Sequence, residues 1–316
     1  MIYTFYSYKG GVGRSMALAN IAELLVEAGL SVIMVDWDLE APGLERFFPV
    51  DTATVLEQPG LMDMLLGYKM RLSQPLPPRA TPRLPEDKRA WYFGRLDDYL
   101  VEIYPAPAAG GEAAPTPGTP RTGRLRLLTA GRRSKGMFEQ YVRAVRTFEW
   151  QDFYVNWGGE AYFDWLREQL NQADAVLIDS RTGVSEMGGV CTYHMADTVV
   201  LFCATNEQNL DGVHKMAADL ASQETQALRP ERLLQVLVVP ARVEFNEGDK
   251  LNRFKRRFLI QFRDSVPKPL ASSAERAARA PAACPQSWRA PATCQAACTS
   301  RRRTPETGSN KSRRTR

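Results

Sequence analysis

The chain has 316 residues, of which 44% are hydrophobic and 24% are charged. These values are typical of a soluble globular protein with enough length for one large α/β domain or two small ones. The sequence lacks both an apolar run of the roughly 20 residues that span a bilayer and the pattern of a secretory signal. We therefore expect a cytoplasmic protein, and an odd count of five cysteines argues against a disulfide framework.

The net charge of +5 is unevenly distributed along the chain. Residues 271–316 contain ten Lys or Arg and two Glu, which gives this segment +8 and leaves −3 for the first 270 residues. A mildly acidic folded part argues against a DNA-binding protein. We expect nucleic acid to bind only weakly, through the Arg-rich segment.

The first predicted elements are a strand, a loop, a helix and a second strand. Residues 2–7 are rich in β-formers, apolar residues recur at helical spacing over 14–28, and residues 31–36 form a buried apolar strand. A strand, a helix and a parallel strand in that order make the βαβ unit of a doubly wound sheet. Ligands of such sheets bind at the carboxyl ends of the strands.

Strands and helices alternate again in the second half of the chain. The pattern predicts strands at 124–130, 174–179, 197–204 and 233–241, and helices at 134–146, 160–172, 186–195 and 207–222. Near-continuous apolar strands that alternate with helices indicate a mostly parallel sheet covered on both faces. The predicted fold class is therefore α/β, doubly wound, with helices on both faces of the sheet.

The region at about 50–123 interrupts this alternation. Residues 60–72 have a helical pattern, but residues 75–85 and 105–120 are rich in Pro, Gly and Ala and are typical of loops. We interpret the whole region as an insertion after the second strand of a single domain at 1–270, without a core of its own.

The segment 271–316 contains Trp288 as its one large apolar residue. Such a segment cannot bury enough surface to offset its chain entropy, so we expect it to be disordered. It has no apolar face, which argues against a membrane anchor. Two explanations stay open: a frameshifted reading of the gene, or a natural disordered basic tail.

The stretch "YKGGVGRS" joins the first strand to the first helix. Such a loop presents successive backbone N–H groups and the positive end of the helix dipole, which together suit a polyphosphate. Its glycines let the backbone approach phosphates closely, and a hydroxyl at the start of the helix can reach Mg²⁺. The loop residues predicted to hold the nucleotide are Gly10, Gly11, Val12, Gly13, Arg14, Ser15 and Met16.

Acidic residues end two of the predicted strands. Asp36 and Asp38 follow the second strand, and Asp179 ends the strand "DAVLID". We predict that Ser15, Asp36 and Asp179 serve Mg²⁺, since a carboxylate at such a strand end can hold the metal through water. The N–H of Gly183, in "SRTG", is placed to sense the γ-phosphate.

The stretches "KGGVGRS", "VDWDLEAPGL" and "VLIDSRTG" together resemble the deviant Walker A ATPases of the MinD/ParA superfamily, in the branch where KGGVGR replaces KGGVGK. The likeness spans about residues 1–270. It implies that Lys9 reaches across a dimer interface to the partner's nucleotide and that Asp38 orients the attacking water. It also implies an ATP-dependent homodimer that hydrolyses ATP slowly with Mg²⁺ and acts on a protein partner, which the sequence leaves unidentified.

Arg14 departs from the superfamily, which has lysine at this position. Arginine keeps the charge, but its planar fork cannot take the same place beneath the phosphates. We expect nucleotide binding to be retained and the rate of hydrolysis to be in question. The predicted function is a molecular switch that positions or recruits other macromolecules, and the alternative is an ATP-binding sensor in a signalling or defence assembly that does not hydrolyse ATP.

Two further features have open interpretations. Arg242 follows the last predicted strand, where it is either a contact to the adenine side of the nucleotide or an ordinary surface residue. The stretch 148–166 holds eight aromatic residues, which either pack the insertion against the sheet or form a docking patch for a partner. Packing is the interpretation that we favour.

Overall fold

The computed structural model describes residues 1–74, 92–105, 123–183, 186–229, 232–244 and 248–263. The expected tail at 271–316 lies outside the described residues. So do the loop expected at 75–85 and all but the first residue of the loop expected at 105–120.

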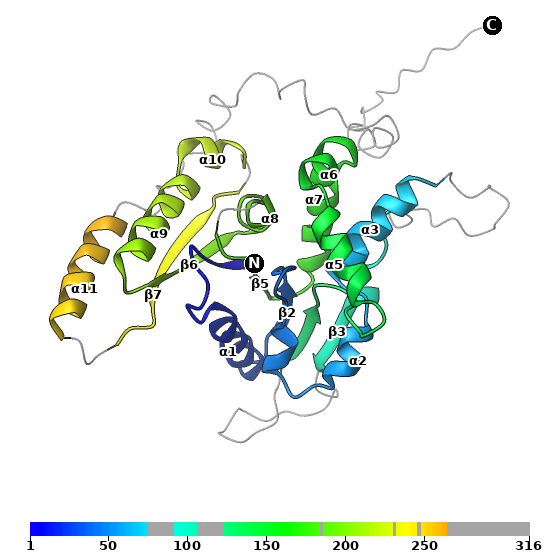
Figure 1. Ribbon diagram of the computed structural model, residues 1–316, viewed down its shortest axis with the longest axis horizontal. Helices are drawn as coiled ribbons and strands as arrows, with labels where there is room; N and C mark the ends of the chain where they lie inside the picture. Colours follow the sequence, from blue (N-terminus) through cyan, green and yellow to red (C-terminus); the bar gives the residue numbers. More distant parts are fainter. Residues whose placement is uncertain (75–91, 106–122, 184–185, 230–231, 245–247, 264–316) are drawn as a thin grey trace, which may run out of the picture.

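One sheet of seven strands organises the described part of the chain, in the order β3-β4-β2-β5-β1-β6-β7 (Figure 1). The strands are β1 Ile2–Ser7, β2 Ser31–Asp36, β3 Leu100–Tyr104, β4 Arg124–Leu128, β5 Ala175–Asp179, β6 Thr198–Ala204 and β7 Gln235–Ala241. Every adjacent pair is parallel except β3 with β4. The predicted doubly wound, mostly parallel sheet is confirmed.

Helices connect and cover these strands. They are α1 Arg14–Glu27, α2 Thr52–Glu57, α3 Leu61–Leu72, α5 Phe138–Thr147, α6 Trp150–Asn156, α7 Gly159–Leu170, α8 Glu186–Gly189, α9 Glu207–Leu220, α10 Gln223–Ala227 and α11 Gly248–Phe262. Short 3-10 segments run over Leu44–Phe47 and Leu96–Tyr99, and a π-helical segment, Val190–Met195, continues α8. The helix predicted at 186–195 is therefore present, but its second half has the wider π turn.

The alternation of side chains along the strands sends one apolar set to each face of the sheet. In β2, Ile33 and Val35 pack in the cluster that includes α3, α6 and α7, whereas Val32 and Met34 pack in the cluster that includes α1. A third cluster joins β6 to α9 and α11. Both faces of the sheet therefore carry helices, as Figure 1 shows.

The segment expected to be an insertion contributes to the main core and to the sheet. In α3, Leu61, Met64, Leu65 and Tyr68 are fully buried. β3 adds an antiparallel edge strand beside β4. β3 runs antiparallel to its neighbour β4. Adjacent antiparallel strands need no helical crossover between them.

The aromatic stretch at 148–166 is part of the core. Phe153, Tyr162 and Phe163 have no exposed surface, and Trp165 is 5% exposed. The ring centroids of Phe153 and Tyr162 lie 5.5 Å apart in an edge-to-face arrangement, a geometry that stabilises aromatic pairs beyond their burial. The packing interpretation is confirmed.

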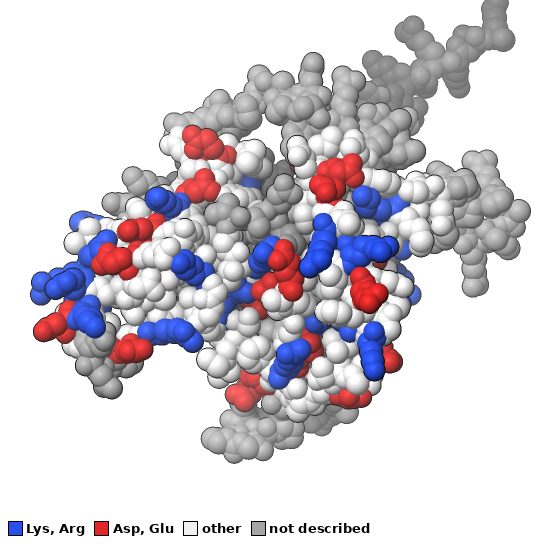
Figure 2. Space-filling view, in the orientation of Figure 1, with Lys and Arg blue, Asp and Glu red and all other residues white. Residues whose placement is uncertain are grey.

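Helix α11 was not predicted from the sequence, although its apolar residues recur at helical spacing. Leu251 and Phe254 are buried, and Phe258 and Phe262 pack partly against the cluster of α9. Its opposite face is basic, with Arg253 and Arg256 exposed. Figure 2 shows this gathering of Lys and Arg side chains at the α11 end of the molecule.

None of the described helices is long and apolar enough to cross a membrane.

Candidate nucleotide-binding site

The loop between β1 and α1 has the backbone shape of a phosphate cradle. Gly11 has φ +74° and Gly13 has φ +83°, both in the left-handed region that favours glycine. Gly13 is the cap residue of α1, a helix of 14 residues, and no side chain caps this end. The free N–H groups of the first turn and the helix dipole are therefore available to an anion.

Helix α9 and the segment after β5 hold this loop in position. A Cβ at Gly212 in α9 would lie 2.3 Å from the Tyr8 ring, so only glycine leaves room for the ring. The exposed ammonium of Lys9 donates a hydrogen bond of 2.5 Å to Gln208, also in α9. The Tyr6 hydroxyl donates to the carbonyl of Gly183. The position of the loop therefore depends on α9 and on the segment after β5.

Two carboxylates meet at the adjacent ends of β2 and β5. Asp36 and Asp179 are register partners, and they are 1% and 3% exposed. Burial and the neighbouring Asp179 raise the pKa of Asp36 to about 7, although backbone N–H groups of Leu44 and Gly43 donate to its Oδ2 at 3.1 and 3.0 Å. Burial also raises the pKa of Asp179, because it outweighs the attraction to the Arg14 guanidinium.

Arg14 extends from the start of α1 toward these acids and is 6% exposed. Its Nε donates to Oδ1 of Asp179 over 2.5 Å, and its Nη2 donates to Oδ2 of Asp38 over 3.3 Å. Its Nη1 lies 3.5 Å from the Ser7 hydroxyl. A single guanidinium thus bridges the residue predicted to hold the metal and the residue predicted to orient water.

The oxygen donors near Asp179 are of the kind that Mg²⁺ prefers. The Ser15 side chain lowers the pKa of Asp179 against the larger effect of burial, so the predicted hydroxyl lies near the predicted carboxylate. Within the described part of the chain, where Arg14 is bonded to Asp38 and Asp179, no group of three or more His, Cys, Asp or Glu side chains is arranged to hold a metal ion. The residues therefore fit an Mg²⁺ ion held largely by Ser15 and phosphate oxygens, provided that Arg14 releases Asp179.

The remaining predicted site residues have different surroundings. Val12 is buried and Met16 is 56% exposed. The N–H of Gly183 donates to the carbonyl of Ser7 over 3.1 Å, so a bond to a γ-phosphate would require that contact to break. Arg242 is exposed, with φ +52°, directly after β7.

A buried ion pair behind Asp36 was missed from the sequence. Nη2 of Arg133 lies 3.1 Å from Oε2 of Glu45, whose side chain has no exposed surface. The Arg133 guanidinium lowers the pKa of Asp36, but burial raises it by more. Nearby, Arg181 pairs with Glu40 in the loop after β2. No motif spacing marks these residues, because the pairs join distant parts of the chain.

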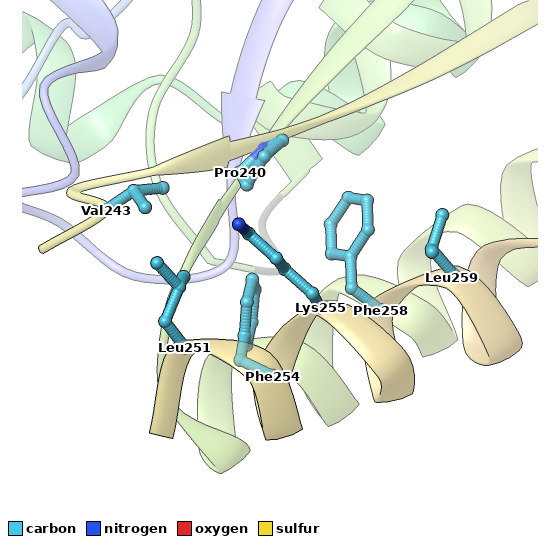
Figure 3. A pocket seen from close by; sticks show the side chains of 7 residues that line it. All are labelled: Pro240, Val243, Leu251, Phe254, Lys255, Phe258 and Leu259. Atoms are coloured by element: carbon cyan, nitrogen blue, oxygen red, sulfur yellow. The ribbon is translucent and has the colours of Figure 1, made fainter. Parts of the chain in front are cut away.

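An apolar cavity of about 190 Å³ lies between β7 and α11. It is lined by Pro240, Val243, Leu251, Phe254, Lys255, Phe258 and Leu259. Figure 3 shows Lys255 reaching from α11 toward β7, among aliphatic and aromatic side chains. Lys255 is the one charged residue in this lining, and the other lining residues are apolar. The cavity therefore suits a triphosphate less well than the glycine loop does.

Comparisons with known proteins give a partial sequence match and similar folds. No family model matches the chain. Over 54 residues it is 43% identical to cytosolic Fe-S cluster assembly factor CFD1 of Chaetomium globosum, a match that covers 17% of this chain and 18% of that protein. The chain thus spans less than a fifth of the length of the curated relative that it matches.

Solved structures share the fold over most of the chain. The pNOB8 ParA protein bound to nonspecific DNA has a TM-score of 0.50 and 15% identity, over 84% of this chain and 76% of that one. MinD of Pyrococcus horikoshii OT3, complexed with Mg-ADP, has a TM-score of 0.44 and 16% identity, over 75% and 69% of the two chains. The comparison with pNOB8 ParA shows that this chain shares its fold over most of its length.

Proposed function

We propose that this protein binds ATP with Mg²⁺ and acts as a slowly hydrolysing, dimerising switch that positions or recruits partner macromolecules. One observation carries the proposal. The left-handed glycine loop, the open N-terminus of α1 and the paired carboxylates of Asp36 and Asp179 converge at the carboxyl edge of the sheet. Doubly wound sheets bind their ligands at this edge.

The proposed roles follow the predicted site. The loop Gly10–Met16 holds the phosphates, and Ser15, Asp36 and Asp179 serve Mg²⁺, which when bound neutralises charge on the phosphate oxygens. Asp38 orients the attacking water, and Lys9 reaches the nucleotide of a second subunit. Gly183 and Arg242 are assigned to the γ-phosphate and to the base.

The exposure of Lys9 is compatible with a role across an interface. Its ammonium is held on the surface by Gln208 of the same chain rather than over the loop. A surface ammonium held by one neutral amide can exchange that partner for a phosphate at little cost, since water already competes for an exposed charged group.

The test combines turnover and assembly in the full chain. We expect slow release of phosphate from ATP with Mg²⁺, and a doubling of molar mass by light scattering with a slowly hydrolysed ATP analogue but not with ADP. A folded protein that stays monomeric with the analogue and releases no phosphate would contradict the proposed switch function.

A second candidate function is an ATP-binding sensor that does not hydrolyse ATP. It is favoured by the engagement of both Asp38 and Asp179 with Arg14. The variant Arg14→Lys separates the two candidates. If turnover appears only in the variant while ATP affinity changes little, the sensor is the better description.

A further inference from the structure

Arg14 is directed away from the place where a phosphate would enter. Its side chain is 6% exposed, and in the described structure its guanidinium bonds to the side chains of Ser7, Asp38 and Asp179. The loop glycines Gly10 and Gly11, by contrast, are exposed. The guanidinium therefore faces the carboxylates rather than the open side of the cradle.

A buried guanidinium between two carboxylates stabilises their negative charge, as a bound metal cation does, but with one positive charge instead of two. In the buried, low-dielectric site each carboxylate depends on a nearby positive charge. Charge-assisted hydrogen bonds to the guanidinium add to this attraction. Arg14 occupies Oδ1 of Asp179, so a divalent cation beside Ser15 competes with the guanidinium for that carboxylate.

Lysine could not bridge the same pair of acids. Its ammonium is a point charge on a flexible stem, whereas the planar fork of arginine presents several N–H groups in fixed directions. In this structure Nε and Nη2 of Arg14 use that fork to reach Asp179 and Asp38 at once. Replacing the arginine by lysine therefore frees at least one carboxylate.

We infer that Arg14 is an internal counter-ion that competes with Mg²⁺ for Asp179 and so sets the metal requirement of the site. The next step rests on the proposed function. Nucleotide phosphates offer the Arg14 guanidinium another anionic partner, so nucleotide binding draws Arg14 away from Asp38 and Asp179. Asp179 and Asp38 are then released together, one for the metal and one for water. Arg14 is thus a positioning residue that couples phosphate, metal and water.

The test measures binding of Mn²⁺ alone, without nucleotide, by the loss of the free-ion signal in electron paramagnetic resonance. Mn²⁺ has the oxygen-ligand preference of Mg²⁺. The full-length wild type is compared with Arg14→Lys and Arg14→Gln, after circular dichroism shows which variants are folded. Arg126→Lys is the matched control, because Arg126 is also a buried arginine of the sheet region, paired with Asp97 at 3.1 Å.

We expect both Arg14 variants to bind Mn²⁺ at least about tenfold more tightly than the wild type, with the glutamine variant at least as tight as the lysine variant. The control should bind within twofold of the wild type. Affinities of the Arg14 variants within twofold of the wild type would overturn the inference. If Mn²⁺ binding tightens but no variant binds an ATP analogue, the counter-ion role stands and the proposed function fails.

Discussion

Nε of Arg14 and Oδ1 of Asp179 are joined by a hydrogen bond of 2.5 Å, although 165 positions separate the two residues in the chain. The contact connects the phosphate loop after β1 to the acidic end of β5. In the wider superfamily that the motifs resemble, the residue at position 14 is a lysine that contacts phosphate. Here the substituted residue turns toward the acids, which makes its position the main difference between this site and the expected one.

Lys9→Ala should remove nucleotide-dependent dimerisation and leave the fold intact. Lys9 is exposed, and its one hydrogen-bonding partner in the described part of the chain is Gln208, so its loss removes little intrachain stability. The measurement is molar mass by light scattering with a slowly hydrolysed ATP analogue and Mg²⁺. Lys135→Ala, at another exposed lysine, should dimerise like the wild type. Normal dimerisation of Lys9→Ala would contradict the role proposed for Lys9.

Asp36 should make the stability of the protein depend on pH. Its pKa is raised from 3.8 to about 7 in the folded state, so the folded state binds the proton more tightly than the unfolded chain. The resulting stabilisation is complete below about pH 4 and is lost as pH rises to about 7, with a slope of up to roughly 1.4 kcal/mol per pH unit. Urea denaturation between about pH 5 and 8, with EDTA present, measures this slope.

The variant Asp36→Asn isolates that contribution, because the amide is neutral throughout. Its free energy of unfolding should fall less between about pH 5 and 7 than that of the wild type, by on the order of 1 kcal/mol or more. Asp98→Asn, at an exposed aspartate, should keep the wild-type slope. Equal slopes in the wild type and in Asp36→Asn would show that Asp36 does not titrate in this way.

Phe153→Ala should destabilise the protein by about 3–5 kcal/mol, because it leaves a large cavity in the aromatic part of the core. Phe153 has no exposed surface and contacts the rings of Tyr68, Phe148, Tyr162 and Phe163. Phe138→Ala, at a phenylalanine 54% exposed, should cost less than about 1 kcal/mol. Chemical denaturation measures both, and similar small losses would mean that the aromatic stretch is not a packing element.

Gly212→Ala should weaken nucleotide binding, although Gly212 lies in α9 and not in the phosphate loop. The added Cβ would lie 2.3 Å from the ring of Tyr8, so the ring and the loop beside it must move, at a cost of about 1–3 kcal/mol. Gly136→Ala is the control, since its Cβ would meet nothing within 4 Å. Titration with a fluorescent ATP analogue should show a loss of affinity in Gly212→Ala only. Equal affinities in the two variants would show that α9 does not set the position of the loop.

The sheet and the placement of its acids could be predicted from the sequence because they depend on local patterns. Apolar strands such as β5 are continuous runs that end at a carboxylate, and parallel pairing then brings Asp36 beside Asp179. The glycine loop has equally local requirements, which Gly11 and Gly13 meet with left-handed φ angles. These features follow from residue type and spacing alone.

Other features depend on contacts between distant segments and could not be predicted in this way. The direction of Arg14 depends on where Asp38 and Asp179 lie, and the buried pair of Glu45 and Arg133 has no motif. The edge strand β3 lies in a region where Pro-rich loops dominate the composition. Only α11 carried a usable signal, in the helical spacing of its phenylalanines.

Isothermal titration calorimetry with Mg²⁺ and a slowly hydrolysed ATP analogue tests the central claim most directly. The full-length protein should bind one nucleotide per chain, and Gly13→Val should abolish binding, because a β-branched residue cannot readily adopt the φ of +83° at the start of α1. Absence of binding heat at several temperatures, from wild-type protein shown by circular dichroism to be folded, would contradict a nucleotide site in this loop.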